Sequence, residues 1–490
     1  MYRHRKIRFI EPGGRPGRPF NAWIRRWPLL GPVLLATVLD RRGYDAAVYN
    51  ESLSGSILDD PEALEDVCTA DVVGISIMTP TAHRGYQIAD RIRRLAPQVT
   101  IVFGGVHATF LPEEALAHGD MVVRGEGEGV IETIASGAVR EGIVRADPVD
   151  PLDVLPTPDF RLMRDFDRLV RLNGSRELYQ VPLMSSRGCP YACRYCSVSR
   201  MFGRRVRRLS VENVLRDVRH YLDQGFRRFF FYDDSFTSDR RWATELLERM
   251  RPLRVSFNAQ VRADFHWADP HREHLDRRLL ASMRRAGGDV LYIGYETVDD
   301  ATARRWGKGY RGRGPLRERL HADTQILHDN GFWIHGMFIL GPQHTQRGAD
   351  GIVDFARRSG IESIQVSILT PLPGTPFMEQ VRPYLLFTDC PGDWDYYDGT
   401  HCVYGHGRLG IEGLQRAVLN VHRRFYGWTG WSLRRIRGLL EQRLPAWSKL
   451  TSLWANGRIA RTMLRQWRRE MREFLKLVPA RTAGRLPQPT

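Results

Sequence analysis

The sequence predicts an α/β protein in three parts: a doubly wound parallel-sheet domain, a barrel of parallel strands, and a helical C-terminal region. Two observations predict this order. Residues 28–145 alternate between apolar strand patterns and amphipathic helix patterns, as in an open parallel sheet covered by helices. Strand–helix units then repeat from about residue 181 to residue 384, as in a barrel whose chemistry lies at the carboxyl ends of its strands.

We place the domain boundaries where the composition changes. The segment 150–158 (DPLDVLPTP) is rich in proline and aspartate and is typical of a linker. The expected parts are an α/β domain over 1–148, a linker over 149–180, a barrel over 181–384, and a basic, tryptophan-rich, mostly helical region over 385–490.

In the first domain, small and polar residues follow the expected strands. We expect helices over 28–42 and 82–95 and strands over 46–49, 70–78, 100–103 and 121–123. Open parallel sheets bind ligands beyond the carboxyl ends of their strands, and glycines there let the backbone approach a ligand closely. The residues at these ends are Ser76, Gly104, Gly105, Gly125, Glu126 and Gly127.

Four segments of this domain, taken in order, resemble a known ligand-binding domain. PLLGPVLLATVLDRRGYDAAVYN, GISIMTPT, FGGVHATFLPEEAL and VVRGEGEGVI are similar to the cobalamin (vitamin B12)-binding domain that precedes many radical S-adenosylmethionine (SAM) domains. The resemblance implies that Ser76, Gly104 and Gly105 line the pocket for the nucleotide tail of cobalamin, and that Gly125 and Glu126 also contact the cofactor.

One feature of related cobalamin domains is absent. Methionine-synthase-like domains carry Asp-x-His-x-x-Gly, whose histidine ligates cobalt, and this chain has no such motif. We therefore expect cobalamin to bind without a protein histidine on cobalt. The alternative is a degenerate domain that binds nothing or helps to bind substrate.

Three cysteines lie within eight residues at the start of the barrel. Cys189, Cys193 and Cys196 have the spacing Cys-x3-Cys-x2-Cys, which indicates metal binding or catalysis rather than disulfides. A 4Fe–4S cluster usually takes four cysteines, so three would leave one iron open. A zinc site is one alternative, although structural zinc needs four ligands. An electron-carrier cluster that takes its fourth ligand from Cys390 or Cys402 is another.

The cysteine spacing closely resembles that of radical SAM enzymes. The resemblance implies a six-stranded partial (β/α)6 barrel, SAM bound to the open iron, and reductive cleavage of SAM to a 5′-deoxyadenosyl radical at the cluster held by the three cysteines. It also implies further SAM contacts. These are Tyr195 near adenine, Asp233 and Asp234 at the amino group, Glu296 at the ribose, and the segment from Gly336 to Gly341 near adenine.

The expected barrel elements follow one another regularly. Besides the strand that leads to the cysteines, we expect strands over 228–234, 255–264, 290–297, 333–341 and 363–373. The expected helices span 210–224, 239–250, 275–286, 316–330 and 348–359.

The positive charge of the chain is concentrated in its last 70 residues. The formal net charge is +17, and residues 421–490 carry +13 of it. Because no RNA-binding module accompanies this charge, we expect no nucleic-acid partner. A helix over 459–478 would present an apolar stripe, which fits an anionic membrane surface, an acidic partner, or packing on the barrel. The stripe comprises Ile459, Met463, Trp467, Met471 and Phe474.

No apolar run reaches the roughly 18 residues that a membrane-spanning helix needs. We expect a cytoplasmic protein, with a peripheral position at the inner membrane face if the C-terminal helix binds lipid.

The combined patterns predict a cobalamin-dependent radical SAM enzyme that methylates an unactivated carbon of a small-molecule or lipid-like substrate. It would need a reducing electron donor of the flavodoxin or ferredoxin type. Radical oxidation, cyclisation or rearrangement without methyl transfer is an alternative within enzymes. A non-catalytic iron–sulfur electron-transfer protein is the alternative outside them.

Overall fold

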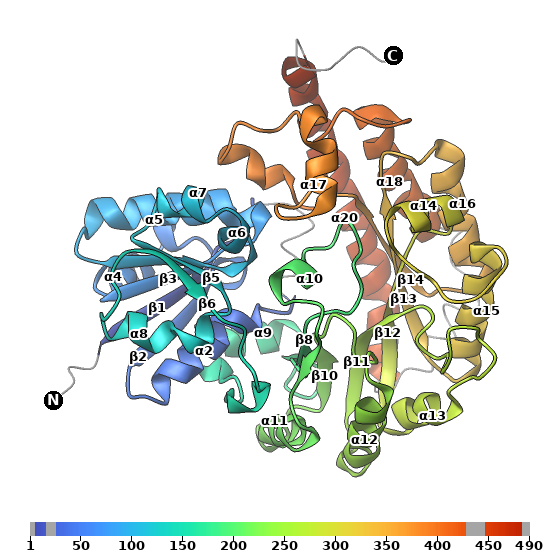
Figure 1. Ribbon diagram of the computed structural model, residues 1–490, viewed down its shortest axis with the longest axis horizontal. Coiled ribbons are helices and arrows are strands. Elements are labelled where there is room, and N and C mark those ends of the chain that lie inside the picture. The colour runs from blue at the N-terminus through green and yellow to red at the C-terminus, as the bar shows by residue number, and fades with distance from the viewer. Residues whose placement is uncertain (1–4, 16–25, 428–445, 483–490) are drawn as a thin grey trace.

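The computed structural model describes residues 5–15, 26–427 and 446–482. In the last helix, side chains are described from residue 462 onward, except at residue 463. Two α/β units lie side by side, and part of the C-terminal region extends from the second unit back toward the first (Figure 1).

The first unit is a six-stranded sheet in which all neighbouring strands are parallel. The strand order is β2–β1–β3–β4–β5–β6. The chain therefore reverses its direction of winding between β1 and β3, and in such sheets ligands bind beside this switch point. The strands are β1 (Lys6–Glu11), β2 (Asp45–Asn50), β3 (Val72–Ser76), β4 (Thr100–Gly104), β5 (Met121–Gly125) and β6 (Gly142–Ala146).

Helices cover this sheet and confirm the predicted doubly wound fold. The predicted helix over 82–95 is present with the same bounds, and that over 28–42 is shortened to 30–40. The helices are α2 (Leu30–Asp40), α3 (Glu51–Ser54), α4 (Pro61–Cys68), α5 (Ala82–Leu95), α6 (Gly105–Phe110), α7 (Pro112–Leu116) and α8 (Ile131–Ala135).

We did not predict β1 and β6, although β1 is central in the sheet. The strand KIRFIE has charged residues among its apolar ones, so its sequence does not indicate that it is buried. Arg8 is only 6% exposed, and its guanidinium pairs with Asp45 (3.0 Å) and Asp66 (2.6 Å). These contacts, made by residues far along the chain, allow a charged residue in a buried strand.

The second unit contains the six parallel strands predicted for a partial barrel, in the order β14–β13–β12–β11–β10–β7. In the described part of the chain, the edge strands β7 and β14 do not pair with each other, so the barrel is open. The strands are β7 (Gln180–Leu183), β10 (Arg228–Phe231), β11 (Ser256–Arg262), β12 (Gly288–Glu296), β13 (Trp333–Leu340) and β14 (Ser363–Ile368).

The predicted barrel helices are all present, within two residues at each end. They are α11 (Val211–Asp223), α12 (Arg240–Met250), α13 (Arg277–Arg285), α15 (Leu316–Asp329) and α16 (Gln346–Arg358); α14 (Asp300–Arg305) is an additional short helix.

Aromatic side chains fill the interior of the barrel near the amino ends of its strands. Trp27, which precedes α2 in the first unit, is 4% exposed there. Its ring centroid lies 4.6 Å from that of Phe230 and 6.1 Å from that of Tyr292. A residue from the first unit thus helps to close the lower part of the second. The surrounding side chains are Val290, Trp333 and Met337.

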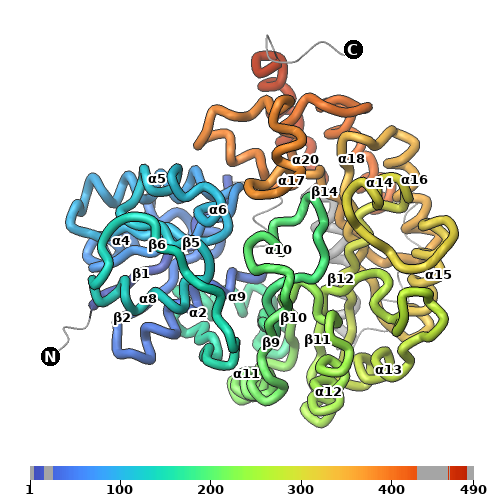
Figure 2. Tube along the Cα trace, in the orientation of Figure 1, coloured from blue at the N-terminus to red at the C-terminus, as the bar shows by residue number. Residues whose placement is uncertain are grey.

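The expected linker over 149–180 contains ordered structure. It includes α9 (Phe166–Leu172) and two short 3-10 helices, and the chain trace passes through it from one unit to the other (Figure 2). Asp159 donates its backbone N–H to the Thr37 hydroxyl (2.8 Å), while the Thr157 hydroxyl donates to Asp217 on α11. The segment therefore binds to both units.

The C-terminal region packs on the barrel. It contains α18 (Gly410–Tyr426) and α20 (Ala446–Thr482), and α17 (Pro376–Val381) lies just before it, at the end of the predicted barrel range. In the predicted apolar stripe, Trp467 packs at a tilt against His422 of α18, Phe474 stacks on Phe387, and Met471 is buried. This half of the stripe faces protein, so it is not available to a membrane. Ile459 and Met463 lie outside the described side chains.

No helix among the described residues is both long enough and apolar enough to cross a membrane.

Residues 387–398 extend from the barrel to the first unit (Figure 1). The indole N–H of Trp394 donates to Glu114 on α7 (2.8 Å), and the same ring packs edge-on against His107 of α6. His83 of α5 lies 3.4 Å from Asp395. This segment thus ties the C-terminal region to the helices beside the carboxyl edge of the first sheet.

Candidate active site

A short antiparallel ribbon closes the loop that carries the three cysteines. β8 (Ser186–Arg187) leads into the loop and β9 (Arg207–Arg208) leads out of it. At the base of the loop, Gly188 has φ +97°, and a Cβ there would lie 2.6 Å from the carbonyl oxygen of Arg205. Only glycine permits this approach, so the ribbon fixes the start of the loop.

The three cysteines are partly buried free thiols in this loop. The backbone N–H groups of Tyr191 and Val198 donate to the sulfurs of Cys189 and Cys196. Burial raises the pKa of the Cys196 thiol to about 12 and also raises that of Cys189. Bound iron would displace these protons, because the thiolate is the ligand. Three thiols in one loop, two of them with backbone donors, fit a 4Fe–4S cluster.

In the described part of the chain, no three His, Cys, Asp or Glu side chains converge as ligands of a single metal ion. A cubane cluster does not require such convergence, since its cysteines bind separate irons.

Asp233 holds the chain that leads into the loop. Its carboxylate accepts the backbone N–H of Ser185 (3.0 Å) and the hydroxyls of Ser185 (2.9 Å) and Ser186 (2.6 Å). The side chain is 1% exposed, and burial raises its pKa to about 6. Both oxygens therefore have donors within the protein, and the contact of Asp233 with SAM stays a prediction.

Asp234 is placed differently from its neighbour. It is exposed to solvent but surrounded on most sides by protein. Burial raises the pKa of Asp234 to about 7, with a further contribution from Asp233. Its charge also acts on Cys189 and Cys196, so the carboxyl lies beside the cysteine loop. Of the predicted pair, Asp234 is the residue with room to bind the SAM amino group.

Glu296 ends β12 in a strained conformation beside a buried lysine. Its φ is +60°, at a break in the register between β12 and β13. A non-glycine residue with this φ is frequently found where function requires it. The Glu296 carboxylate lies 3.1 Å from the ammonium of Lys308, which is 8% exposed. Lys308 also acts electrostatically on Cys189, so this ion pair adjoins the loop.

Two aromatic residues of the cysteine loop pack against the barrel. The guanidinium carbon of Arg262, at the end of β11, lies 3.8 Å from the ring centroid of Tyr191. Tyr195 meets Trp306 edge-on, with ring centroids 5.7 Å apart. These contacts hold the loop over the carboxyl ends of β11 and β12.

Gly336 lies in the middle of β13 rather than at its end. A Cβ on Gly336 would lie 3.0 Å from Phe338 and 3.3 Å from Ile361, in the layer between strand and helices. The SAM contact at Gly336 stays a prediction. Gly341 follows the strand, and its Cβ position lies 3.1 Å from Trp306, which places it nearer to the cysteine loop.

The carboxyl edge of the first sheet is built from glycine backbone. Ser76 pairs with Gly104 across β3 and β4. Gly105 has φ +91°, and a Cβ there would lie 2.7 Å from the carbonyl oxygen of Ile77, whereas a Cβ on Gly104 would meet nothing within 4 Å. This edge therefore leaves open space beside Gly104, where a ligand can approach the backbone, and it fits cobalamin.

Glu126 reaches across to the barrel. Its carboxylate binds Arg187 on β8 (2.7 Å) and also Arg207 on β9. Burial alone would raise the pKa of Glu126, but the two guanidinium groups hold it below its ordinary value. The neighbouring Gly125, with φ +111°, would place a Cβ 2.5 Å from the carbonyl oxygen of Ala146.

The described histidines of the first unit all have carboxylate neighbours. His107 is fully buried, with its ring nitrogens 3.3 Å from the Thr79 hydroxyl and 3.2 Å from Glu114. His83 lies beside Asp395 and His118 lies 2.9 Å from Asp90. That cobalamin binds without a histidine ligand on cobalt stays a prediction.

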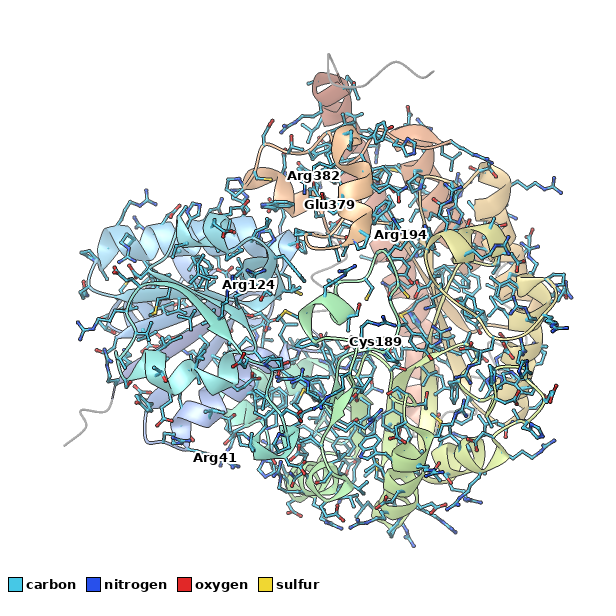
Figure 3. All side chains as sticks on the ribbon, viewed as in Figure 1. Arg41, Arg124, Cys189, Arg194, Glu379 and Arg382 are labelled. Carbon is cyan, nitrogen blue, oxygen red and sulfur yellow. The ribbon has the colours of Figure 1, made fainter. Side chains whose placement is uncertain are left out.

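The two edges face each other. Figure 3 shows Cys189 and Arg194 on the side of the barrel unit that faces the first unit, and Arg124 on the facing side of the first unit.

Family models match both units. Residues 25–135 match the B12 binding domain and residues 183–356 match the radical SAM superfamily. The chain belongs to the radical SAM enzymes with a B12-binding domain. Their cofactors are a 4Fe–4S cluster, SAM and cobalamin, as the residues predict.

Similar proteins share this layout. The chain is 28% identical over 402 residues to bacteriochlorophyllide d C-12(1)-methyltransferase of Chlorobaculum tepidum, covering 80% of this chain and 82% of that protein. It is 24% identical to the anaerobic magnesium-protoporphyrin IX monomethyl ester cyclase of Rubrivivax gelatinosus, covering 77% and 70%. The radical SAM methyltransferase TsrM of Kitasatospora setae, with cobalamin and a [4Fe-4S] cluster bound, has the same fold, with a TM-score of 0.66 at 15% identity over 96% and 100% of the chains.

Three residues of the site escaped sequence reasoning. Lys308 could have been noticed in the sequence, because it is one of only four lysines in the chain. Arg262 and Glu11 carried no such signal, because only the fold brings them to strand ends beside the proposed pockets. Glu11 ends β1 at the switch point and is 1% exposed.

Proposed function

We propose that this enzyme is a cobalamin-dependent C-methyltransferase that acts on an unactivated carbon of a small-molecule or lipid-like substrate. It cleaves SAM reductively, takes a hydrogen atom from that carbon and replaces it with a methyl group. One observation carries the proposal: the turn after β5, at the cobalamin edge, contacts the ribbon that bears the cysteine loop. When bound, the cluster supplies the electron that cleaves SAM, and cobalamin carries the methyl group.

The chain's own residues have separate tasks in this proposal. Cys189, Cys193 and Cys196 hold the cluster, and Asp234 binds the SAM amino group. Glu296, oriented by its ion pair with Lys308, would accept hydrogen bonds from the ribose hydroxyls.

The structure of the first unit suggests how cobalamin is held. Ser76 and the backbone at Gly104 and Gly105 would contact its nucleotide tail, and Gly125 would lie next to it. These contacts rest on the open space at Gly104 and on the register of Ser76 with Gly104.

Exclusion of water follows from the aromatic packing inside the barrel. A carbon radical must be shielded from solvent and from competing hydrogen donors. The rings of Trp27, Phe230 and Tyr292 close the amino end of the barrel. The reaction would therefore take place between this floor and the cobalamin edge.

The enzyme also needs a one-electron donor, for which a reduced flavodoxin or ferredoxin is suitable. Relatives named as methyltransferases act on bacteriochlorophyllide d, which supports a small-molecule substrate.

The second candidate is radical oxidation or cyclisation without methyl transfer. The similarity to the anaerobic magnesium-protoporphyrin IX monomethyl ester cyclase, over 70% of that protein, supports this candidate. SAM with a deuterated methyl group distinguishes the two, because only a methyltransferase incorporates the label into product.

The cysteine positions argue against a simple electron carrier. Cys402 is 1% exposed, and its thiol lies 3.3 Å from the carbonyl oxygen of Tyr404. The pKa of the Cys390 thiol is raised by burial and by the charges of Glu114, Asp393 and Asp389, and the cysteine loop does not contribute to this shift. Neither is placed as a fourth cluster ligand.

The test is anaerobic reconstitution with iron, sulfide and hydroxocobalamin, followed by dithionite and SAM. We expect 5′-deoxyadenosine in the wild type and none in Cys193→Ala, with cobalamin retained in both. Cys402→Ala is the matched control and should keep full turnover. Deoxyadenosine without bound cobalamin would contradict the methyltransferase proposal, and no deoxyadenosine would contradict the radical reaction.

A further inference from the structure

A buried ion network joins the turn at the cobalamin edge to both strands of the ribbon below the cysteine loop. Arg187 donates to Glu126 (2.7 Å) and to Glu128 (2.5 Å). Arg207 donates to both oxygens of the Glu126 carboxylate, one of which Arg187 also contacts, and to the carbonyl oxygen of Val149 (2.6 Å). One glutamate thus connects β8 and β9 to the same turn.

This network is inside the protein. Glu126 is 4% exposed, Arg187 8% and Arg207 6%. Two carboxylates face two guanidinium groups, so the charges balance. Removing one partner from such a network leaves a buried charge uncompensated, which makes the geometry hard to change.

The network acts at the base of the cluster loop. Arg187 lies two residues before Cys189, and Arg207 begins the strand that leaves the loop. On the other side, Asp233 of the barrel holds Ser185 and Ser186 through three hydrogen bonds. The chain before the first cysteine is therefore held by the barrel and by the cobalamin domain together.

We propose that Glu126 is a positioning residue that fixes the distance between bound cobalamin and the iron–sulfur cluster. This inference rests on the proposed function, since both cofactors must act on one substrate carbon. It replaces the contact between Glu126 and cobalamin predicted from the sequence. Both carboxylate oxygens are already bound by arginine, and one also accepts the backbone N–H of Val149 (3.1 Å).

The test measures the distance directly. Dithionite reduces both cofactors to states with one unpaired electron, cob(II)alamin and [4Fe–4S]⁺, and pulsed dipolar electron paramagnetic resonance gives the distribution of distances between them. We expect a single narrow distribution in the wild type and at least a twofold broader one in Glu126→Gln, which keeps the side-chain volume but loses the charge. The cobalamin content should be unchanged.

Glu132→Gln is the matched control, because Glu132 lies in the same unit and pairs with Arg42 at the surface. Its distribution should equal that of the wild type. If Glu126→Gln does not fold, Glu128→Gln provides the test, since it removes only the contact with Arg187 and should also broaden the distribution.

An unchanged width in these variants would overturn the proposal. Loss of cobalamin from Glu126→Gln with the cluster intact would also overturn it, because that result assigns Glu126 to the cofactor pocket. So would a broad distribution in the wild type. The measurement needs no substrate, so an enzyme that proves not to transfer methyl groups would leave its result valid.

Discussion

The two edges that face each other across the proposed site are built differently. The cobalamin edge presents backbone: Gly104, Gly105 and Gly125 make the turns, and two of them have positive φ. The barrel edge presents charged side chains, among them Asp234 and the Glu296–Lys308 pair. A large, mostly neutral ligand can be held by shape and backbone contacts, whereas a small zwitterion such as SAM requires charges at fixed points. Substitutions that add side-chain volume should therefore weaken the cobalamin edge, and substitutions that remove a charge should weaken the barrel edge.

The largest effect on turnover is expected from Lys308→Met at the barrel edge. The change leaves Glu296 partly buried without its counter-charge, which costs about 3 kcal/mol, so SAM cleavage should fall about a hundredfold. Deoxyadenosine formation under dithionite measures this. Arg304→Met, at an exposed position in the same segment, is the control, and equal turnover in Lys308→Met and the wild type would contradict the role given to the ion pair.

The cobalamin edge is tested by two adjacent glycines. Gly105→Ala adds a Cβ against backbone at a positive φ, which should destabilise the fold by about 1–3 kcal/mol. Gly104→Ala adds a Cβ into open space, so stability should change by less than about 0.5 kcal/mol. Cobalamin affinity should nevertheless fall about tenfold, because the methyl group takes space that the ligand needs.

Equilibrium binding of hydroxocobalamin and urea unfolding separate these outcomes. Gly31→Ala, also in open space but on α2, should leave cobalamin affinity unchanged. Wild-type affinity in Gly104→Ala would show that cobalamin does not lie at this position.

Glu11 is an exception at the cobalamin edge, a buried acid whose pKa is raised by burial to about 8. In the folded state it keeps its proton to higher pH than in the unfolded state. Stability is therefore lost as pH rises from about 4.5 to about 8, by at most about 5 kcal/mol. Glu11→Gln should remove this slope.

Urea unfolding at several pH values measures the slope. Asp66, whose pKa Arg8, Lys6 and Tyr49 lower despite its burial, should contribute the opposite sign, with stability lost as pH falls. A pH profile of Glu11→Gln identical to that of the wild type would contradict the assignment.

The smallest effect is expected where the C-terminal region meets the first unit. Trp394→Phe removes the indole donor to Glu114. The free energy of unfolding should fall by only about 1 kcal/mol, because Tyr86 still donates to that carboxylate (2.9 Å). Thermal unfolding measures it against Leu477→Ala, at a side chain that is 41% exposed. A loss no greater than in the control would mean that this contact does not support the segment.

Much of the fold was predictable because its signals are local. The helix over 82–95 and the barrel strands repeat apolar residues at regular spacing, and the periodicity alone predicts them. β1 was not predictable, since its buried Arg8 depends on Asp45 and Asp66. The segment 149–180 was predicted only as a linker, and its contacts with Thr37 and α11 were not predictable from local sequence.

For the site, the sequence indicated the residue types and the structure their partners. The three cysteines are defined by spacing within one loop, and the glycines by their positions after strands. Asp233 and Asp234 are adjacent in sequence and look equivalent, yet one is bound by serines and the other reaches solvent. No local pattern distinguishes them.

The sequence by itself determined the chemistry of this enzyme: a three-cysteine loop, glycine turns after parallel strands, and the order of the two units. These features lie within short segments, so spacing defines them. Only the tertiary structure decided which charges are buried and with whom they pair. Glu126 pairs with Arg187 and Arg207, which lie more than 60 positions further along the chain. These partners determine the role of the carboxylate, because an unpaired charge is not tolerated inside a protein.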